Sequence, residues 1–245
     1  MNYRQLNKAR LIAILEREEW IKTHRCRHGH TYAEHPQCLY DEHPEMALNL
    51  NNPETVFGEK ICFLDIEASN LKADFGVPLS WHITDMKDDN VVHDFITIKD
   101  MEEVKKTGEF DRPDKRMLGN FVDKVIQYNR VVTHYGTYFD LPFLRSRCIY
   151  DDIPFPEYGT LYQDDVWKWA KHKLCISSNR QKNISKFFYG ESEKTEIKHK
   201  HWLGYFFGDT ESINYVVKHG DIDVMELKHN WLKLLPYVRI TKTSI

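Results

Sequence analysis

Two carboxylates interrupt an otherwise apolar run in the segment that contains Phe63, Asp65 and Glu67. Side chains two positions apart lie on the same face of a β-strand, so Asp65 and Glu67 are expected side by side. Two ionised carboxylates so placed repel each other and lose hydration unless a cation lies between them. The pair therefore predicts a site for Mg²⁺ or Mn²⁺, which prefer oxygen ligands. An isolated motif of this kind would more often be a solvent-facing pair on an edge strand.

A third acid, Asp140, begins a predicted helix over 140–150, directly after a strand and a turn that contains Gly136. Pro142 fits the first turn of that helix, where a missing N–H costs nothing. Taken alone, Asp140 would be an ordinary helix N-cap. Its place at a strand-to-helix turn also allows it to join a site built on the first strand.

His219 and Asp223 are four positions apart in a predicted helix over 210–234 and therefore share one face. Imidazole, with a pKa near 6.5, can take a proton from water near neutral pH. A surface His–Asp pair is the alternative. Asp221 is another candidate for the last acid, but the positions four and five residues before it are Val217 and Val216. Asp223 is therefore preferred.

Together these residues resemble the DEDD exonuclease superfamily, which has the ribonuclease-H-like fold. The resemblance is more specific to predicted 3′–5′ exonucleases related to the proofreading domain of family-B DNA polymerases. It covers roughly residues 56–235 and includes the D-x-E pair with Ser69-Asn70-Leu71 after it, Phe139-Asp140, the stretch 177–190, Trp202 and Gly208.

The resemblance implies that four acids, Asp65, Glu67, Asp140 and Asp223, hold two Mg²⁺ or Mn²⁺ ions. Such ions stabilise the attacking and leaving oxygens of a phosphodiester. It also implies hydrolysis of 3′ ends of single-stranded or frayed DNA or RNA, with DNA slightly favoured, and allows a replication or repair protein as partner. The implied substrate contacts are Ser69, Asn70, Leu71, Tyr135 and Phe139.

Two positions depart from the family pattern. His219 is separated from Asp223 by three residues, which is the spacing of the tyrosine in the family's tyrosine branch. Tyr135 precedes Gly136 at the position where the family usually has an Asn. Type-I ribonucleases H and transposases also gather acids on this fold, but their second acid lies on a helix, so the D-x-E pair favours an exonuclease. A catalytically silent nucleic-acid-binding or recruitment module is the alternative from another functional class.

The run from residue 26 to residue 38 is rich in Cys and His. Cys26, His30, His35 and Cys38, with His28 as a substitute for His30, form a possible tetrahedral Zn²⁺ set. A structural zinc would stabilise a segment too small to build its own core. Free side chains in a surface loop are the alternative.

A cluster of cations and rings lies between residues 194 and 207. Cations bind phosphates and rings stack on bases in single-strand binders. We expect Lys198 and Lys200 near the substrate, while the rings of Trp202, Tyr205 and Phe206 are expected in the core, the commoner fate of large aromatics.

The predicted elements are α/β: a ribonuclease-H-like mixed five-stranded sheet flanked by helices, with a small N-terminal His/Cys-rich extension. A helix is expected over 3–20, a polar linker at 49–53 and a boundary near residue 55, which gives domains 1–55 and 56–245. Strands are expected at 60–69, 79–86, 91–99, 130–134 and 158–163, and helices at 117–128, 140–150, 166–172, 179–189 and 210–234.

Composition narrows the function classes for this chain of 245 residues. The net charge of −3 gives no bulk signal for nucleic-acid binding. Five cysteines at irregular spacing do not indicate a disulfide framework. Without an apolar run of roughly 18 residues or a signal-peptide core, a soluble, cytoplasmic protein is expected.

Overall fold

The computed structural model describes residues 19–34, 38, 42, 59–86, 89–238 and 243–245. The chain divides into two units, Met1–Lys60 and Ile61–Ile245. In the first unit, residues 19–23 are helical and Trp20 stacks on His24 and Tyr32. Most of the helix expected over 3–20, the linker 49–53 and the boundary near residue 55 lie outside the described residues.

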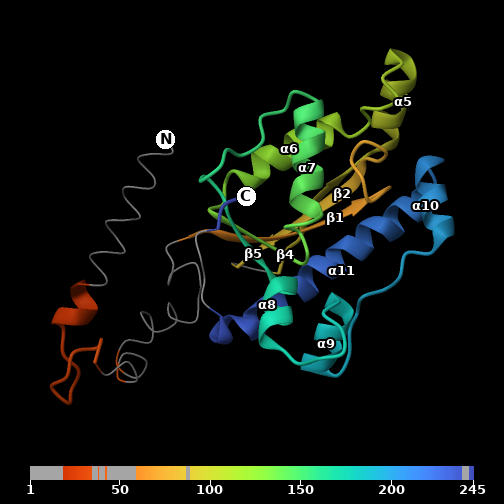
Figure 1. The fold of residues 1–245 in the computed structure, drawn as a ribbon. Helices are drawn as coiled ribbons and strands as arrows, with labels where there is room; N and C mark the ends of the chain where they lie inside the picture. Colours follow the sequence, from red (N-terminus) through yellow and green to blue (C-terminus); the bar gives the residue numbers. More distant parts are fainter. Residues whose placement is uncertain (1–18, 35–37, 39–41, 43–58, 87–88, 239–242) are drawn as a thin grey trace. The chain divides into compact units, whose positions relative to one another are not determined.

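The second unit is built on a five-stranded mixed sheet with strand order β3-β2-β1-β4-β5 (Figure 1). Its strands are β1 (Ile61–Ala68), β2 (Pro78–Asp85), β3 (Val92–Phe95), β4 (Arg130–Thr133) and β5 (Tyr162–Asp165). The first three form an antiparallel meander, while β4 lies parallel to both β1 and β5. The expected mixed five-stranded architecture is therefore confirmed.

Helices account for most of the remaining described chain. They are α5 (Ile98–Thr107), α6 (Lys115–Val125), α7 (Asp140–Tyr150), α8 (Val166–Lys173), α9 (Gln181–Tyr189), α10 (His199–Phe206) and α11 (Thr210–Leu234), followed by the short helix η1 (Leu235–Tyr237). No described helix is both long and apolar enough to cross a membrane.

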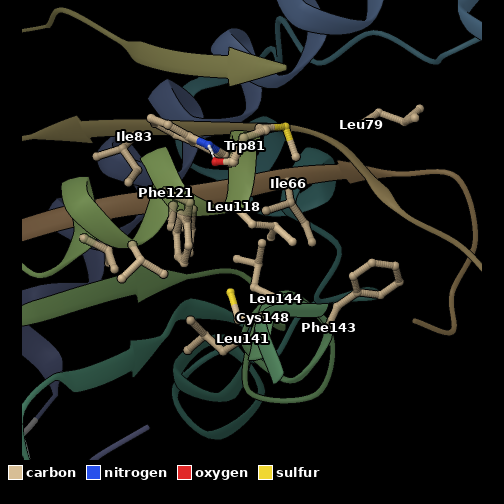
Figure 2. Close-up of a cluster of buried hydrophobic side chains, with 14 of the residues drawn as sticks. Ile66, Leu79, Trp81, Ile83, Leu118, Phe121, Leu141, Phe143, Leu144 and Cys148 are labelled. Atoms are coloured by element: carbon tan, nitrogen blue, oxygen red, sulfur yellow. Dashed lines mark hydrogen bonds between the residues drawn. The ribbon is translucent and has the colours of Figure 1, made fainter. Parts of the chain in front are cut away.

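The sheet separates two helical layers. Alternate side chains of β1, such as Leu64 and Ile66, pack with Leu118 of α6 and Leu144 of α7 in the main core (Figure 2). The opposite face of β1 meets α11, where the rings of Phe63 and Trp231 pack edge to face at 5.5 Å. Asp65 and Glu67 lie two and four positions after Phe63 in the strand, so their side chains are on the same face of the sheet as the Phe63 ring. They therefore face α11 rather than the apolar layer.

Two helices were not expected from the sequence. The strand expected over 91–99 ends at Phe95, and α5 begins after Thr97. Thr97 and Asp100 form a capping box in which each side chain accepts the other's backbone N–H, at 3.2 and 2.7 Å. Helix α10 arises within the cation- and ring-rich segment, while β5 begins and ends later in the chain than the strand expected over 158–163.

Candidate active site

Three predicted site residues meet where β1 faces α11. The Nε2 atom of His219 lies 3.6 Å from Oε1 of Glu67 and 3.4 Å from Oδ2 of Asp223. All three side chains are buried, and their ligand atoms lie within 4.8 Å of one another. Asp65 lies on the same face of β1, two residues before Glu67. The helical spacing and the strand spacing thus bring these residues to one place.

Asp140 reaches the site through the turn between β4 and α7. Tyr135 adopts a left-handed φ of 68°, and a Cβ at Gly136 would lie 2.4 Å from the side chain of Thr133. The carboxylate of Asp165 accepts the backbone N–H of Tyr135 at 2.9 Å and that of Thr137 at 3.1 Å. The turn is therefore fixed at several points before Asp140 starts the helix.

Phe139 occupies the N-cap position of α7, and Asp140 is the first residue of the helix. The carboxylate is 4% exposed. The simple N-cap interpretation therefore does not describe Asp140. Its carboxylate instead accepts hydrogen bonds from the backbone of Asp140 and of Ile66, the β1 residue between Asp65 and Glu67, and both bonds lower its pKa against the effect of burial.

The electrostatics of the site favour a bound cation. Burial, followed by the negative charge of Asp223, raises the pKa of Asp65 well above its ordinary value and that of Glu67 to about 8. Burial raises the pKa of Asp140 to about 7 and also raises that of Asp223. The shifts show that ionising all four carboxylates together is costly without added positive charge.

Lys194 supplies positive charge within this group. Its ammonium forms an ion pair with Asp223. Burial alone would lower the pKa of Lys194, but the carboxylates of Asp65 and Asp223 outweigh that effect and raise it. Lys194 belongs to the cluster of cations and rings at 194–207, in which Lys198 and Lys200 are the predicted substrate contacts, because spacing alone cannot show which lysine turns toward the acids.

The donor set fits Mg²⁺ or Mn²⁺. Four carboxylates supply hard oxygen ligands, and Oδ1 of Asp223 is buried with no hydrogen-bond partner among the described residues. Asp65, Glu67, Asp140 and Asp223 are therefore able to hold such ions. The ammonium of Lys194 and a bound ion would both interact with the carboxylate of Asp223.

Lys194→Met is expected to tighten Mn²⁺ binding about tenfold, because the ion no longer competes with an ammonium for Asp223. Isothermal titration calorimetry above pH 8 measures this change. Lys186→Met, which alters an exposed lysine in the last turn of α9, serves as the matched control. Equal or weaker Mn²⁺ binding by Lys194→Met would contradict a direct competition.

His219 is oriented by a residue that the sequence analysis did not identify. Its Nδ1 lies 2.6 Å from Oγ1 of Thr195, next to Lys194 in the segment before α10. Burial lowers the pKa of His219 below its ordinary value, although Asp223 opposes the shift. The imidazole is therefore neutral at neutral pH and points its Nε2 toward the acids.

Asp221 points away from this group. Its Oδ1 lies 2.8 Å from Nδ1 of His82 and 2.9 Å from Nδ1 of His93. Of the two acids weighed from the sequence, only Asp223 contacts His219 and Lys194.

The predicted substrate contacts differ in their surroundings. Ser69 closes the loop after β1, because its Oγ accepts the backbone N–H of Val77 at 2.9 Å. The Oδ1 of Asn70 accepts the N–H of Lys72 at 3.2 Å. The side chain of Leu71 is 77% exposed and therefore free to contact a ligand.

A cavity of about 610 Å³ lies between the loop after β1 and the start of α7. Leu71, Lys72, Tyr138, Phe139 and Pro142 contribute to its lining. Two predicted contacts, Leu71 and Phe139, thus meet at one concave surface, whose lining does not include the four acids. Exposed Tyr135 lies outside this lining, with its ring centroid 5.0 Å from that of Tyr138.

The cation- and ring-rich segment is only partly as expected. Lys198 precedes α10 and Lys200 lies in its first turn, and both are exposed. Tyr205 is in the core, where its hydroxyl donates to the carbonyl oxygens of Leu79 and Ile96. The expectation that Phe206 lies in the core is wrong, because its side chain is 52% exposed.

The N-terminal unit contains a separate group of possible metal ligands. Nδ1 of His28 lies 3.1 Å from Sγ of Cys38 and 4.0 Å from Sγ of Cys26. The structure thus groups His28, the substitute considered for His30, with the two thiols. His35 lies outside the described residues. Two thiols and one imidazole suit Zn²⁺, which is bound by Cys and His in structural sites.

We expect one Zn²⁺ at this group after dialysis, measured by elemental analysis as the difference in zinc content between wild type and a variant without the two thiols. A Cys26→Ser, Cys38→Ser double variant is expected to lose that zinc and to unfold at a lower temperature. The variant keeps all four acids and therefore retains nuclease chemistry on a short oligonucleotide. Wild-type protein that folds normally without zinc would contradict the prediction.

Comparisons with known proteins agree with the fold. The family model RNase_H_2, of the RNase_H superfamily, matches residues 62–230, and the chain belongs to this family. A search of curated proteins found no match. Among solved structures, the chain is similar to the family B DNA polymerase of the hyperthermophilic archaeon Pyrobaculum calidifontis, with a TM-score of 0.54 and 14% identity.

That similarity covers 73% of this chain but only 25% of the polymerase chain. It therefore establishes a common fold for the second unit. The family match and the structural likeness confirm the resemblance based on the D-x-E pair and the later motifs, and family membership supports nuclease activity in general.

Proposed function

We propose that this protein is a metal-dependent 3′–5′ exonuclease that acts on single-stranded or frayed nucleic-acid ends. The convergence of Asp65, Glu67, Asp140 and Asp223 with His219 carries the proposal. These residues come from β1, α7 and α11, far apart in the chain, yet their charges act on one another. A packing role does not require so many buried acids in one place.

In this proposal the four acids hold Mg²⁺ or Mn²⁺, which supplies Lewis-acid stabilisation of the phosphodiester oxygens. His219 orients the attacking water or accepts its proton, with Thr195 fixing the imidazole. Lys194, once released from Asp223, is close enough to the acids to neutralise a substrate phosphate. Leu71 and Phe139, which line one cavity, contact the terminal nucleotides.

An aromatic and basic group near the predicted contact Tyr135 supports a nucleic-acid substrate. Trp167 packs edge to face with Tyr135 and Tyr138, at centroid distances of 5.1 and 6.0 Å. The ammonium of Lys168 lies 4.9 Å from the Tyr138 ring, and that of Lys171 lies 4.8 Å from the Trp167 ring. Exposed rings with cations beside them bind bases and phosphates of single strands.

The four-acid site would bind a phosphate and the 3′ end, which DNA and RNA share. A preference for DNA over RNA therefore depends on contacts to the sugar. We favour DNA slightly. The likeness to a family B DNA polymerase supports a replication or repair setting with a protein partner from that machinery.

A nucleic-acid-binding module without chemistry is the second candidate. The basic and aromatic group near Trp167 would suffice for that function. The four acids favour the enzyme, because their negative charge opposes phosphate binding unless metal ions are present.

The decisive experiment incubates 5′-labelled single-stranded DNA and RNA of equal sequence with the protein and Mg²⁺ or Mn²⁺. Stepwise shortening from the 3′ end, blocked by a chelator and by a 3′-terminal phosphorothioate, is the expected result. A matched 3′-labelled strand should release labelled mononucleotide first. Binding without shortening under both metals would overturn the exonuclease in favour of the binding module.

A further inference from the structure

His82, His93 and Asp221 form a second cluster of metal-binding side chains, distinct from the four acids. They come from β2, β3 and α11, and His82 and His93 are directly opposite each other in the strand pairing. Both Nδ1 atoms lie close to Oδ1 of Asp221, at 2.8 and 2.9 Å. The three ligand atoms lie within 4.8 Å of one another.

The buried member of the cluster, His82, is held in an orientation that directs its Nδ1 atom toward Asp221. His82 is 0% exposed, and its Nε2 lies 2.8 Å from Oγ of buried Ser80. A Cβ at Gly220 would lie 2.3 Å from the His82 ring, so the missing side chain makes room for the imidazole. Metal-binding histidines typically use one nitrogen for the metal while a hydrogen bond to the other fixes the ring.

The other two members leave the cluster open to solvent. The side chains of His93 and Asp221 are 33% and 30% exposed. An ion therefore has an entry path, and water can supply a fourth ligand. Four ligands at about 2.0–2.1 Å in a tetrahedron are about 3.3 Å apart, so each imidazole nitrogen needs to move only about half an ångström from Oδ1 of Asp221 to reach the spacing of ligands around Zn²⁺.

We propose that His82, His93 and Asp221 bind one Zn²⁺ ion through two imidazole nitrogens and a carboxylate oxygen. Imidazole ligands favour Zn²⁺ over Mg²⁺, whereas the four-acid site offers mainly carboxylate oxygen. The ion would join β2, β3 and α11 directly. The proposal does not depend on nuclease activity.

The test uses the full chain carrying Cys26→Ser and Cys38→Ser, which removes the thiol ligands of the N-terminal unit. Equilibrium dialysis against buffered Zn²⁺ with excess Mg²⁺, followed by elemental analysis, measures zinc per chain. One Zn²⁺ is expected, and Asp65→Asn in the four-acid site should leave it bound. His93→Asn should weaken binding by about 100-fold or more, since even outer hydrogen-bond partners cost 10–100-fold.

Two further variants make the result specific. Ser80→Ala should weaken Zn²⁺ binding about tenfold by freeing the His82 ring, without removing a ligand. His172→Asn, at an exposed histidine near the end of α8, should leave Zn²⁺ binding unchanged. Circular dichroism checks that each variant is folded. Absence of bound Zn²⁺, or equal binding by folded His93→Asn, would overturn the proposal and leave a hydrogen-bonded cluster only.

Discussion

Replacing Asp65 by Asn is expected to reduce 3′-end shortening by about 10³-fold or more. The amide keeps the size of the side chain but removes one negative charge from the metal site. Metal ions contribute several kcal/mol to such reactions, and each 1.36 kcal/mol corresponds to a factor of ten in rate. The rate of mononucleotide release from an end-labelled strand at saturating Mg²⁺ measures the loss.

The control is Asp123→Asn, which changes an exposed acid on α6 in the layer across the sheet from the site. It should retain full activity. Folding of Asp65→Asn is checked by thermal unfolding without metal. A variant that folds, binds DNA and still shortens the strand at more than a tenth of the wild-type rate would exclude Asp65 as a metal ligand.

The thermal stability of the metal-free protein is expected to fall as the pH rises. The pKa values of Asp140 and Glu67 are raised to about 7 and about 8 in the folded protein. Stability from their protonated forms is therefore present below pH 4 and is lost as the pH rises through 7 to 8. Metal-free wild type should lose melting temperature across pH 6–9, and Asp65→Asn should lose less.

His219→Ala is expected to lower the cleavage rate by about 10²–10⁴-fold if the imidazole accepts the proton of the attacking water. Burial lowers the pKa of His219, so the logarithm of the wild-type rate should rise with pH and level off at an inflection below 6.5. The rate rises rather than falls with pH because only the neutral imidazole can accept a proton. Initial rates across pH 5–9 at saturating metal provide the measurement.

His219→Tyr separates a proton acceptor from a group that orients water. A phenol at this spacing can hold water by a hydrogen bond, so partial recovery of the rate is expected. Metal-bound water titrates in a similar range, which is why the variants rather than the pH curve decide. If His219→Ala keeps nearly full activity and its acidic inflection, His219 has no part in the chemistry.

Local patterns were sufficient for strands β1 and β2 and for the shared helical face of His219 and Asp223. The apolar run before Asp65 and the alternation of β2 predicted buried strands, and four-residue spacing placed His219 and Asp223 on one helical face. Helix α5 was missed because its start depends on the Thr97–Asp100 capping box, while the preceding strand pattern extended over it. Its own residues are all partly or fully exposed, so no apolar periodicity indicated it.

The rest of the site depends on tertiary placement. Lys194 and Thr195 lie in a segment without regular structure, so no periodicity predicts which side chains turn inward. Asp165 fixes the turn before Asp140 from a neighbouring strand that was predicted to end earlier. His28 and His30 have nearly equivalent spacing to the thiols, and only the path of the loop selects His28.

The close approach of Gly220 to His82 has a mechanical consequence for α11. A shift of α11 by one residue would bring His219 or Asp221 to the position that Gly220 occupies against His82. Either side chain would collide with the buried imidazole if it replaced the glycine. The helix therefore has one permitted register against β2, and this register sets where His219 and Asp223 stand relative to the first strand.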